Sequence, residues 1–377
     1  MKKIKKAALA FLSMLPYLVI GGTCGLSFIS YFEAVEKSGS EVPHILLWSI
    51  LLLGIYLAIY LQIIIHESGH LIFGLMTGYH FGSFRIASFM WIKLDGRIRL
   101  KRHSLPGTVG QCIMSPPVLV DGKMPFVLYN MGGSIMNIIT ALLSFALRFV
   151  IPEGNIFSPL LFLMGMIGLL FALMNGLPLK LGAVNNDGHN ALSMGKDDAA
   201  LRAFWLQMKI AERVAAGLRL RDMPEEWFIF PADADMNNSM IAAVEVFRCN
   251  RLMDEMRFEE AEEAMSKLIR GKNGVLGVHK SLLICDQIYL AILLDRGDDA
   301  VKAMLTEEQM QFMRAMKTFP SVIRTEYALA VGYYRDEKAA QKKLEEFEKI
   351  AKRYPYESDI ESDRELMNLK LTKGEIQ

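Results

Sequence analysis

Long apolar segments alternate with polar connections over the first 180 residues of the chain, and the pattern changes afterwards. The apolar segments cover about residues 7–32, 45–76, 124–150 and 157–179. Each is long enough to cross the ~30 Å hydrocarbon core of a bilayer as a helix. The first exceeds the apolar core of a typical signal peptide, so we expect an uncleaved helix there. The pattern therefore predicts about four transmembrane helices.

The connection between the second and third apolar segments, residues 79–123, has no helical period. Residues 84–93 are rich in β-forming side chains, residues 94–97 form a predicted turn, and residues 98–101 alternate apolar and basic side chains. We expect a short β-hairpin against the membrane surface, with basic side chains toward anionic headgroups. In one interpretation its edge strand captures an extended substrate; in the other it is a connector that packs on the helices.

After residue 196 the apolar positions recur with helical spacing. Three similar segments start at Arg257, Arg296 and Arg335, 39 residues apart, and each begins the second helix of a predicted pair. Acidic residues near the start of each second helix interact favourably with the positive end of the helix dipole. The spacing predicts an α-helical repeat domain similar to tetratricopeptide repeats, whose concave surface binds a cytoplasmic protein or peptide. A compact helical domain with coincidental spacing is the alternative.

The charges divide the chain at the same place. Residues 1–196 hold 15 Lys and Arg against 8 Asp and Glu, and residues 197–377 hold 27 against 33. When four helices are threaded through a bilayer, 13 of those 15 basic residues share the side of the N-terminus, and only Lys37 and Arg148 face the other side. Because Lys and Arg concentrate on the cytoplasmic side, we expect a multi-pass protein of the cell membrane whose N-terminus and C-terminal domain are cytoplasmic.

These patterns together predict a mostly α-helical protein with two domains. Residues 1–196 form a polytopic membrane domain with a short β-hairpin loop, and residues 197–377 form a soluble helical repeat domain. The second domain has a net charge of −6, and no basic face argues for a nucleic-acid partner. Membrane lipid is the expected surrounding of the first domain.

The motif H-E-x-x-H, formed by residues 66–70, ends an uncharged run that extends from Ile45 to Ile65. His66 and His70 lie one helical turn apart and can hold a zinc ion, and Glu67 can serve as general base for the water that a catalytic zinc activates. Ionisable residues within a membrane segment are costly unless they are paired or bound, which favours a functional site. The sequence therefore predicts hydrolysis within a membrane.

A catalytic zinc normally has three protein ligands, and few acidic residues near the membrane segments can supply the third. Asp187 directly follows the fourth predicted helix on the same membrane side as the two histidines. Asp95 lies in the predicted hairpin turn, where an Asp-Gly pair is expected for conformational reasons alone. We favour Asp187 and keep Asp95 as the alternative. The four cysteines form no C-x-x-C pair, which argues against a cysteine-ligated metal.

The chain at this point resembles the site-2 protease family of intramembrane zinc metalloproteases. The resemblance covers roughly residues 45–190 and rests on three motifs in the family's order: His66-Glu67-Ser68-Gly69-His70, then Gly132-Gly133-Ser134-Ile135-Met136-Asn137, then Asn175-Gly176-Leu177-Pro178 with Asp187-Gly188. There are two departures. The family's Gly-Pro in the motif that ends at Asn137 is Gly133-Ser134 here, and residues 179–186 lengthen the gap before Asp187.

The resemblance implies a zinc metalloendopeptidase in which His66, His70 and Asp187 hold Zn²⁺ and Glu67 is the base and later the proton donor. It also implies that Asn175 and Asn137 position the substrate backbone. The expected substrate is a membrane-anchored protein or peptide precursor, cleaved in or next to a transmembrane segment. The alternative is a non-proteolytic membrane adaptor that recruits partners through its helical repeats. Glu67 argues against it, because a scaffold has no need of a general base.

Overall fold

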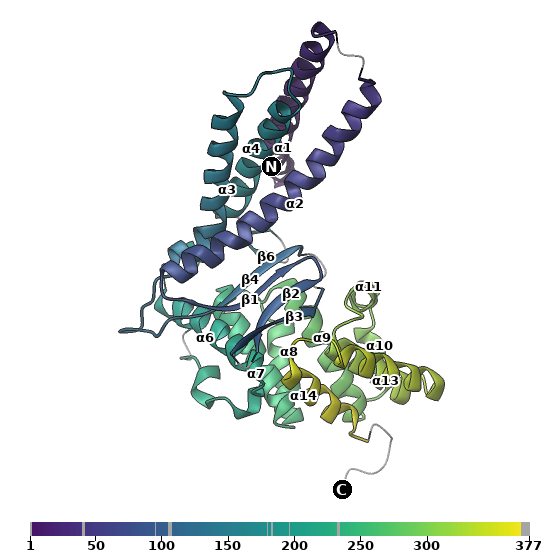
Figure 1. Cartoon of the computed structure of the whole chain (residues 1–377). Coiled ribbons are helices and arrows are strands. Elements are labelled where there is room, and N and C mark those ends of the chain that lie inside the picture. The colour runs from purple at the N-terminus through teal and green to yellow at the C-terminus, as the bar shows by residue number, and fades with distance from the viewer. Residues whose placement is uncertain are drawn as a thin grey trace. The chain divides into compact units, whose positions relative to one another are not determined.

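The computed structural model, drawn in Figure 1, describes residues 2–39, 42–94, 96–104, 108–178, 180–181, 184–195, 197–231 and 234–370. The chain packs into two units. The first consists of Met1–Thr77, Pro125–Lys180 and Asn185–Leu192, and the second of Gly78–Met124, Leu181–Val184 and Ser193–Gln377.

Helices make up the first unit. The elements are α1 (Lys2–Lys37), α2 (His44–Met76), α3 (Val127–Arg148), α4 (Phe157–Gly176) and the short α5 (Asp187–Met194). Between α4 and α5 the chain forms two short paired strands, β5 (Lys180–Leu181) and β6 (Val184–Asn185). Helix α4 packs against α1, α2 and α3, and α2 also packs against α3. The core of this bundle includes Phe28, Leu51 and Leu163.

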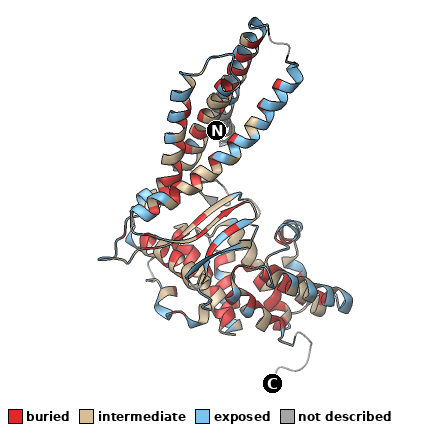
Figure 2. Cartoon of the chain, in the orientation of Figure 1, coloured by how far each residue is buried: buried red, intermediate tan, exposed pale blue. Residues whose placement is uncertain are grey.

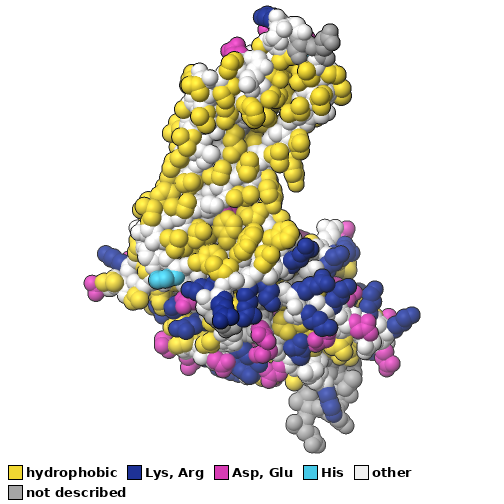
Figure 3. Space-filling view, viewed as in Figure 1, with side chains coloured by type: hydrophobic (Ala, Val, Ile, Leu, Met, Phe, Trp, Pro, Cys, Tyr) yellow, Lys and Arg dark blue, Asp and Glu magenta, His cyan; other side chains and the backbone are white. Residues whose placement is uncertain are grey.

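Four of these helices are long and apolar enough to cross a membrane, as predicted from the apolar segments. The qualifying segments are Leu18–Lys37 and all of α2, α3 and α4. Their outward faces are also apolar: Ile45 and Tyr56 on α2 are 75% and 67% exposed. Figure 2 shows the exposed positions along α2, and Figure 3 shows apolar side chains covering the helices. Such a large apolar surface is typical of a protein that contacts lipid.

A four-stranded antiparallel sheet begins the second unit. Its strands are β1 (His80–Ile86), β2 (Phe89–Leu94), β3 (Arg97–Arg102) and β4 (Gly110–Ser115), in the spatial order β3-β2-β1-β4. Strands β2 and β3 form the predicted hairpin, with Leu94 at the end of β2 paired with Arg97 at the start of β3.

Residues 84–93, expected as a β-rich arm of the hairpin, contribute to two strands, β1 and β2. The chain reverses after Ile86, and residues 84–86 pair back onto residues 89–91. Ala87 adopts a left-handed conformation, with φ of 52°. Glycine or asparagine usually marks such a turn, and neither stands at residues 87 and 88. The sequence therefore carries no local signal for this reversal.

The rest of the second unit is helical. Its elements are α6 (Asp198–Ala215), η1 (Leu220–Asp222), η2 (Glu225–Phe228), α7 (Ser239–Asp254), α8 (Phe258–Arg270), α9 (Gly277–Leu293), α10 (Asp298–Met304), α11 (Glu307–Ala315), α12 (Pro320–Ala328), η3 (Leu329–Tyr333), α13 (Glu337–Ala351) and α14 (Glu357–Met367). Neighbouring helices pack in pairs, α7 with α8, α9 with α10 and α12 with α13. Buried side chains of α7, α8 and α9 form one continuous core.

The three segments that recur every 39 residues each precede the second helix of a packed pair. Arg257 precedes α8, Arg296 lies two residues before α10, and Arg335 lies two residues before α13. Two of the arginines reach back to the preceding pair: Arg296 contacts Glu262 at 2.8 Å and Arg335 contacts Asp298 at 3.4 Å. These segments thus mark helical hairpins. Their grouping into a tetratricopeptide-like array stays a prediction.

The packing divides the chain differently from the predicted boundary between residues 196 and 197. Residues 78–124 belong to the second unit together with the helical region. Strand β4 packs against α6, and the indole Nε1–H of Trp205 on α6 donates to the carbonyl oxygen of Pro117 at 2.8 Å. A position between two apolar segments in the sequence does not determine which partner a small sheet packs on.

Candidate metal centre

Two histidines of helix α2 form the first part of the candidate site. His66 and His70 lie one turn apart, and both side chains are buried. Residues four positions apart share one face of a helix, so both imidazoles point the same way. Glu67 lies on the adjacent face of the same turn and is half-buried. The local helix alone accounts for the spacing of these three side chains.

Asp187 supplies a carboxylate from a segment 121 residues further along the chain. It is the first residue of α5, and Asn186 before it caps this helix. The backbone N–H of His189 donates to Asn186 Oδ1 at 2.9 Å, and Asn186 Nδ2 donates to the carbonyl oxygens of Met174 and Leu177. Asn186 therefore ties the start of α5 to the end of α4.

The glycine of the Asp-Gly pair allows this close approach. A Cβ atom at Gly188 would lie 2.7 Å from the carbonyl carbon of Gly176, well inside van der Waals contact. Gly176 is the last residue of α4. The sequence pairs Asn175-Gly176 and Asp187-Gly188 thus meet through their glycines, and this contact brings Asp187 to the histidines.

Three ligand atoms form a small triangle. His66 Nε2 lies 3.1 Å from Asp187 Oδ2, His70 Nε2 lies 3.4 Å from the same oxygen, and the two nitrogens are 3.2 Å apart. A tetrahedral zinc with ligand bonds of 2.0–2.2 Å sets its ligand atoms about 3.3 Å apart. The three sides of the triangle therefore fit three corners of a zinc tetrahedron. The fourth corner is the position that a catalytic zinc keeps for water or substrate.

Hydrogen bonds to the Nδ1 atoms of His66 and His70 determine which ring nitrogen of each imidazole is a donor. His70 Nδ1 contacts the carbonyl oxygen of Tyr129 at 2.7 Å, and this oxygen can only accept. His66 Nδ1 contacts Asn137 Oδ1 at 2.8 Å. The other amide atom, Asn137 Nδ2, donates to the side-chain and main-chain oxygens of Gln62 at 2.6 and 3.1 Å. Both Nδ1 atoms are therefore donors, and a metal ion within the triangle would meet the Nε2 atoms of both rings.

Three acceptors that face one another within 3.4 Å repel unless a positive charge lies among them. A proton or a metal ion can supply that charge. Burial raises the pKa of Asp187, but the positive charge of a protonated His70 ring and the hydrogen bonds from both imidazoles outweigh burial and hold the pKa well below its ordinary value. The carboxylate is thus ionised at neutral pH and suited to a cation. The donor set of two imidazoles and one carboxylate fits zinc.

Glycines allow α2 and α3 to cross at the site. A Cβ atom at Gly132 would lie 2.6 Å from the carbonyl oxygen of Gly69, and a Cβ atom at Gly133 would lie 2.6 Å from both ring nitrogens of His66. Small residues at such a crossing let two membrane helices approach closely. The small-residue motif before Asn137 therefore has a structural role, because it makes room for the imidazole of His66.

The two residues predicted to position the substrate, Asn137 and Asn175, lie in different surroundings. Asn137 is fully buried and contacts His66, whereas Asn175 near the end of α4 donates to the carbonyl oxygen of Phe171, in its own helix, at 3.0 Å. Their substrate-positioning roles stay predictions. The alternative ligand, Asp95, lies outside the described residues.

Sequence reasoning did not single out Gln62 or Asn186. Gln62 is fully buried in α2, and its amide nitrogen donates to the carbonyl oxygen of Met164 at 3.0 Å. The sequence did indicate Gln62, because a polar residue four positions before His66 in an apolar helix shares the face of the histidine. Asn186 carried no such signal, since it lies in the segment that departs from the family pattern.

No protein-family model matches the chain, and no curated protein or solved structure shows significant similarity to it. The function therefore has to be inferred from the site itself.

Proposed function

We propose that this protein is an intramembrane zinc metalloprotease similar to the site-2 proteases. The observation that carries the proposal is the triangle of His66 Nε2, His70 Nε2 and Asp187 Oδ2, with sides of 3.1–3.4 Å. Two of these ligands lie on a helix that is long and apolar enough to cross a membrane. Glu67, which can act as a base, lies in the same helical turn. A purely structural cluster has no need of this combination.

Zinc in such a site supplies Lewis-acid polarisation of the scissile carbonyl and activation of water. His66 and His70 hold it through Nε2, with Asn137 and the Tyr129 carbonyl keeping the rings oriented. The Glu67 carboxylate accepts a proton from the attacking water and returns it to the nitrogen of the leaving amine. A peptide bond in a helix is shielded by its hydrogen bonds, so the substrate unwinds locally before attack.

The substrate class follows from the surroundings of the site. An active site on membrane helices meets membrane-anchored proteins or peptide precursors, cleaved in or next to a transmembrane segment. The strand β3 is an edge of its sheet, and an edge strand can pair with an extended segment of substrate. The bias of Lys and Arg supports a multi-pass protein of the cell membrane with its N-terminus and its C-terminal helical region in the cytoplasm.

The test is cleavage of co-expressed membrane proteins together with the zinc content of the purified protein. Glu67→Gln keeps the size of the side chain and removes the base, so we expect zinc to stay bound and cleavage to fall by a factor of about 100 or more, within the effect of about 10²–10⁴ for general base catalysis. Asp187→Ala removes a ligand, so both zinc and cleavage are lost. Glu33→Gln, on the exposed surface of α1, is the matched control and retains both.

Cleavage that persists in Glu67→Gln would refute the protease function. An adaptor that recruits partners through its helical region would keep all of its activity in this variant. Full zinc occupancy and full cleavage in Asp187→Ala would redirect the search for the third ligand to Asp95.

A further inference from the structure

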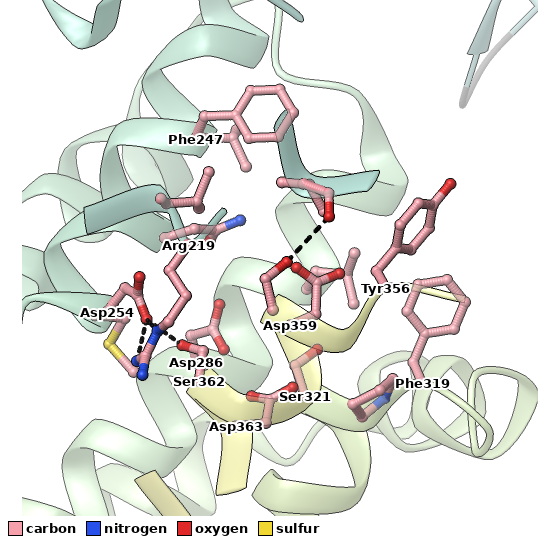
Figure 4. Close-up of a pocket in the computed structure, with 18 of the residues that line it drawn as sticks. Arg219, Phe247, Asp254, Asp286, Phe319, Ser321, Tyr356, Asp359, Ser362 and Asp363 are labelled. Carbon is pink, nitrogen blue, oxygen red and sulfur yellow. Dashed lines mark hydrogen bonds and ion pairs between the residues drawn. The ribbon is translucent and has the colours of Figure 1, made fainter. Parts of the chain in front are cut away.

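A cavity of about 370 Å³ lies within the helical part of the second unit. Its size falls in the range of small-ligand pockets. Helices α6, α7, α9, α12 and α14 contribute to its walls. Six charged side chains line it, as Figure 4 shows in part: Arg219, Asp254, Asp286, Arg324, Asp359 and Asp363. We call this cavity the aspartate pocket. It is separate from the metal-ligand triangle, whose residues all belong to the first unit.

The two arginines of the pocket already have acidic partners. Arg324, which is 3% exposed, contacts Asp286 and donates to Asp363 Oδ1 at 2.5 Å. Arg219 donates through Nε to Asp254 Oδ1 at 3.0 Å and through a terminal nitrogen to Glu365 at 2.5 Å. The four carboxylates of the lining thus outnumber the two guanidinium groups, and Glu365 takes up part of the charge of Arg219.

Asp359 is the lining carboxylate that has no arginine partner. It makes no hydrogen bond or ion pair with any residue that the structure describes. Figure 4 shows it between the Arg219–Asp254 pair and the ring of Tyr356. Burial and the charges of Asp363 and Asp254 raise the pKa of Asp359 to about 7. A bound cation would relieve this repulsion, because an opposite charge nearby favours the ionised carboxylate.

No imidazole among the described residues supplies the missing positive charge. His103, at the end of the sheet, packs its ring against Tyr354 and Tyr356 with centroids 5.3 and 6.3 Å apart. Burial, together with the charge of Arg85, lowers the pKa of His103 to about 4, and burial also lowers the pKa of the lining residue His279. Both rings are neutral at pH 7 and add no positive charge beside Asp359.

Four aromatic rings are part of the lining, beside aliphatic and small polar side chains. Figure 4 shows Phe319 and Tyr356 on one side and Phe247 as a further ring of the wall. Tyr354 packs against Tyr356, with ring centroids 5.8 Å apart. Such rings favour an aliphatic chain that ends in a cation, through contact with the methylene groups and through cation–π attraction. A simple metal ion would not use these surfaces. The combination of an uncompensated carboxylate and aromatic walls specifies an organic cation.

We propose that the aspartate pocket binds an ammonium or guanidinium group on an aliphatic chain, presented by a lysine or arginine side chain of a peptide. The cationic group pairs with Asp359, and the aliphatic chain lies against the rings of Phe319 and Tyr356. This inference does not depend on proteolysis, and binding without cleavage would leave it standing.

The test is calorimetric titration of the full-length protein in detergent with acetyl-Leu-Lys-Leu-amide, its Gln analogue and spermidine. We expect the Lys peptide to bind at least tenfold more tightly than the Gln peptide. Asp359→Asn should weaken the Lys peptide at least tenfold. Asp299→Asn, an exposed residue of α10, removes the same charge outside the pocket and should leave binding unchanged.

The wild-type protein offers a measurement that does not rely on a variant. Because Asp359 must be ionised to pair with the ligand, affinity for the Lys peptide should fall below pH 7 by up to about tenfold per pH unit. Binding near pH 7 should also release a proton, seen as a dependence of the heat on the ionisation enthalpy of the buffer. Equal binding of the Lys and Gln peptides, or a flat pH profile, would overturn the proposal. Binding of spermidine without any binding of the peptide would overturn the peptide as the source of the cation.

Discussion

Replacement of Gly133 by alanine tests how tightly the candidate metal centre is packed. The new Cβ atom would lie 2.6 Å from Nδ1 and Nε2 of His66. Non-bonded heavy atoms need about 3.5 Å, so the imidazole has to move by about 1 Å. The ring is held on both sides, by Asn137 at 2.8 Å and within the ligand triangle, and such a movement breaks these contacts.

The expected effect on zinc is large. Ligand distances in metal sites are held within about 0.2 Å, so a ring displaced by about 1 Å no longer serves as a ligand. Loss of an outer partner of a ligand alone costs about 10–100-fold in metal affinity. We therefore expect zinc affinity to fall at least about 100-fold in Gly133→Ala, which corresponds to about 2.7 kcal/mol.

The assay is chelator competition on the purified protein, with thermal unfolding measured in parallel. Gly165→Ala is the matched control, because its Cβ atom would lie 2.6 Å from Cε1 of Phe145, a ring outside the metal-ligand triangle. Overpacking costs about 1–3 kcal/mol of stability in either variant. Only Gly133→Ala should lose zinc. Wild-type zinc affinity in Gly133→Ala, or an equal loss in Gly165→Ala, would refute the reasoning.

Three further predictions concern both units. Asn137→Ala removes the acceptor of His66 Nδ1 and should lower zinc affinity about 10–100-fold in chelator competition, whereas Asn175→Ala should not change it. Arg324→Met leaves Asp286 and Asp363 without their partner and should lower the free energy of unfolding by about 3–5 kcal/mol in denaturant titration; an unchanged midpoint would contradict this. The folded state raises the pKa of Asp359 from 3.8 to about 7 and holds the proton more tightly than the unfolded chain. The contribution of Asp359 to the free energy of unfolding is therefore greatest below pH 4. This contribution, up to about 4 kcal/mol, is lost as the pH rises to 7. Asp359→Asn should abolish that part of the pH dependence.

Local patterns in the sequence predicted much of this architecture. The four apolar segments coincide with helices of membrane-spanning length, because hydrophobicity and length are properties of a segment by itself. The pairing of β2 with β3 was also predictable from the Asp-Gly pair in the sequence between them. The reversal at Ala87 and the strand β4 were not, since a left-handed alanine has no characteristic local sequence and β4 forms by pairing with a distant strand.

The sequence by itself determined which side chains share a helical face. His66, Glu67 and His70 lie within one turn, and the geometry of the α-helix requires that the two histidines point the same way. Only the tertiary structure decided what meets them. Asp187 and Asn137 reach the histidines through the packing of α2, α3 and α4, at glycine contacts that no local rule specifies. The physical reason is that a contact across 121 residues depends on how whole helices pack, whereas a contact across four residues depends only on the helix.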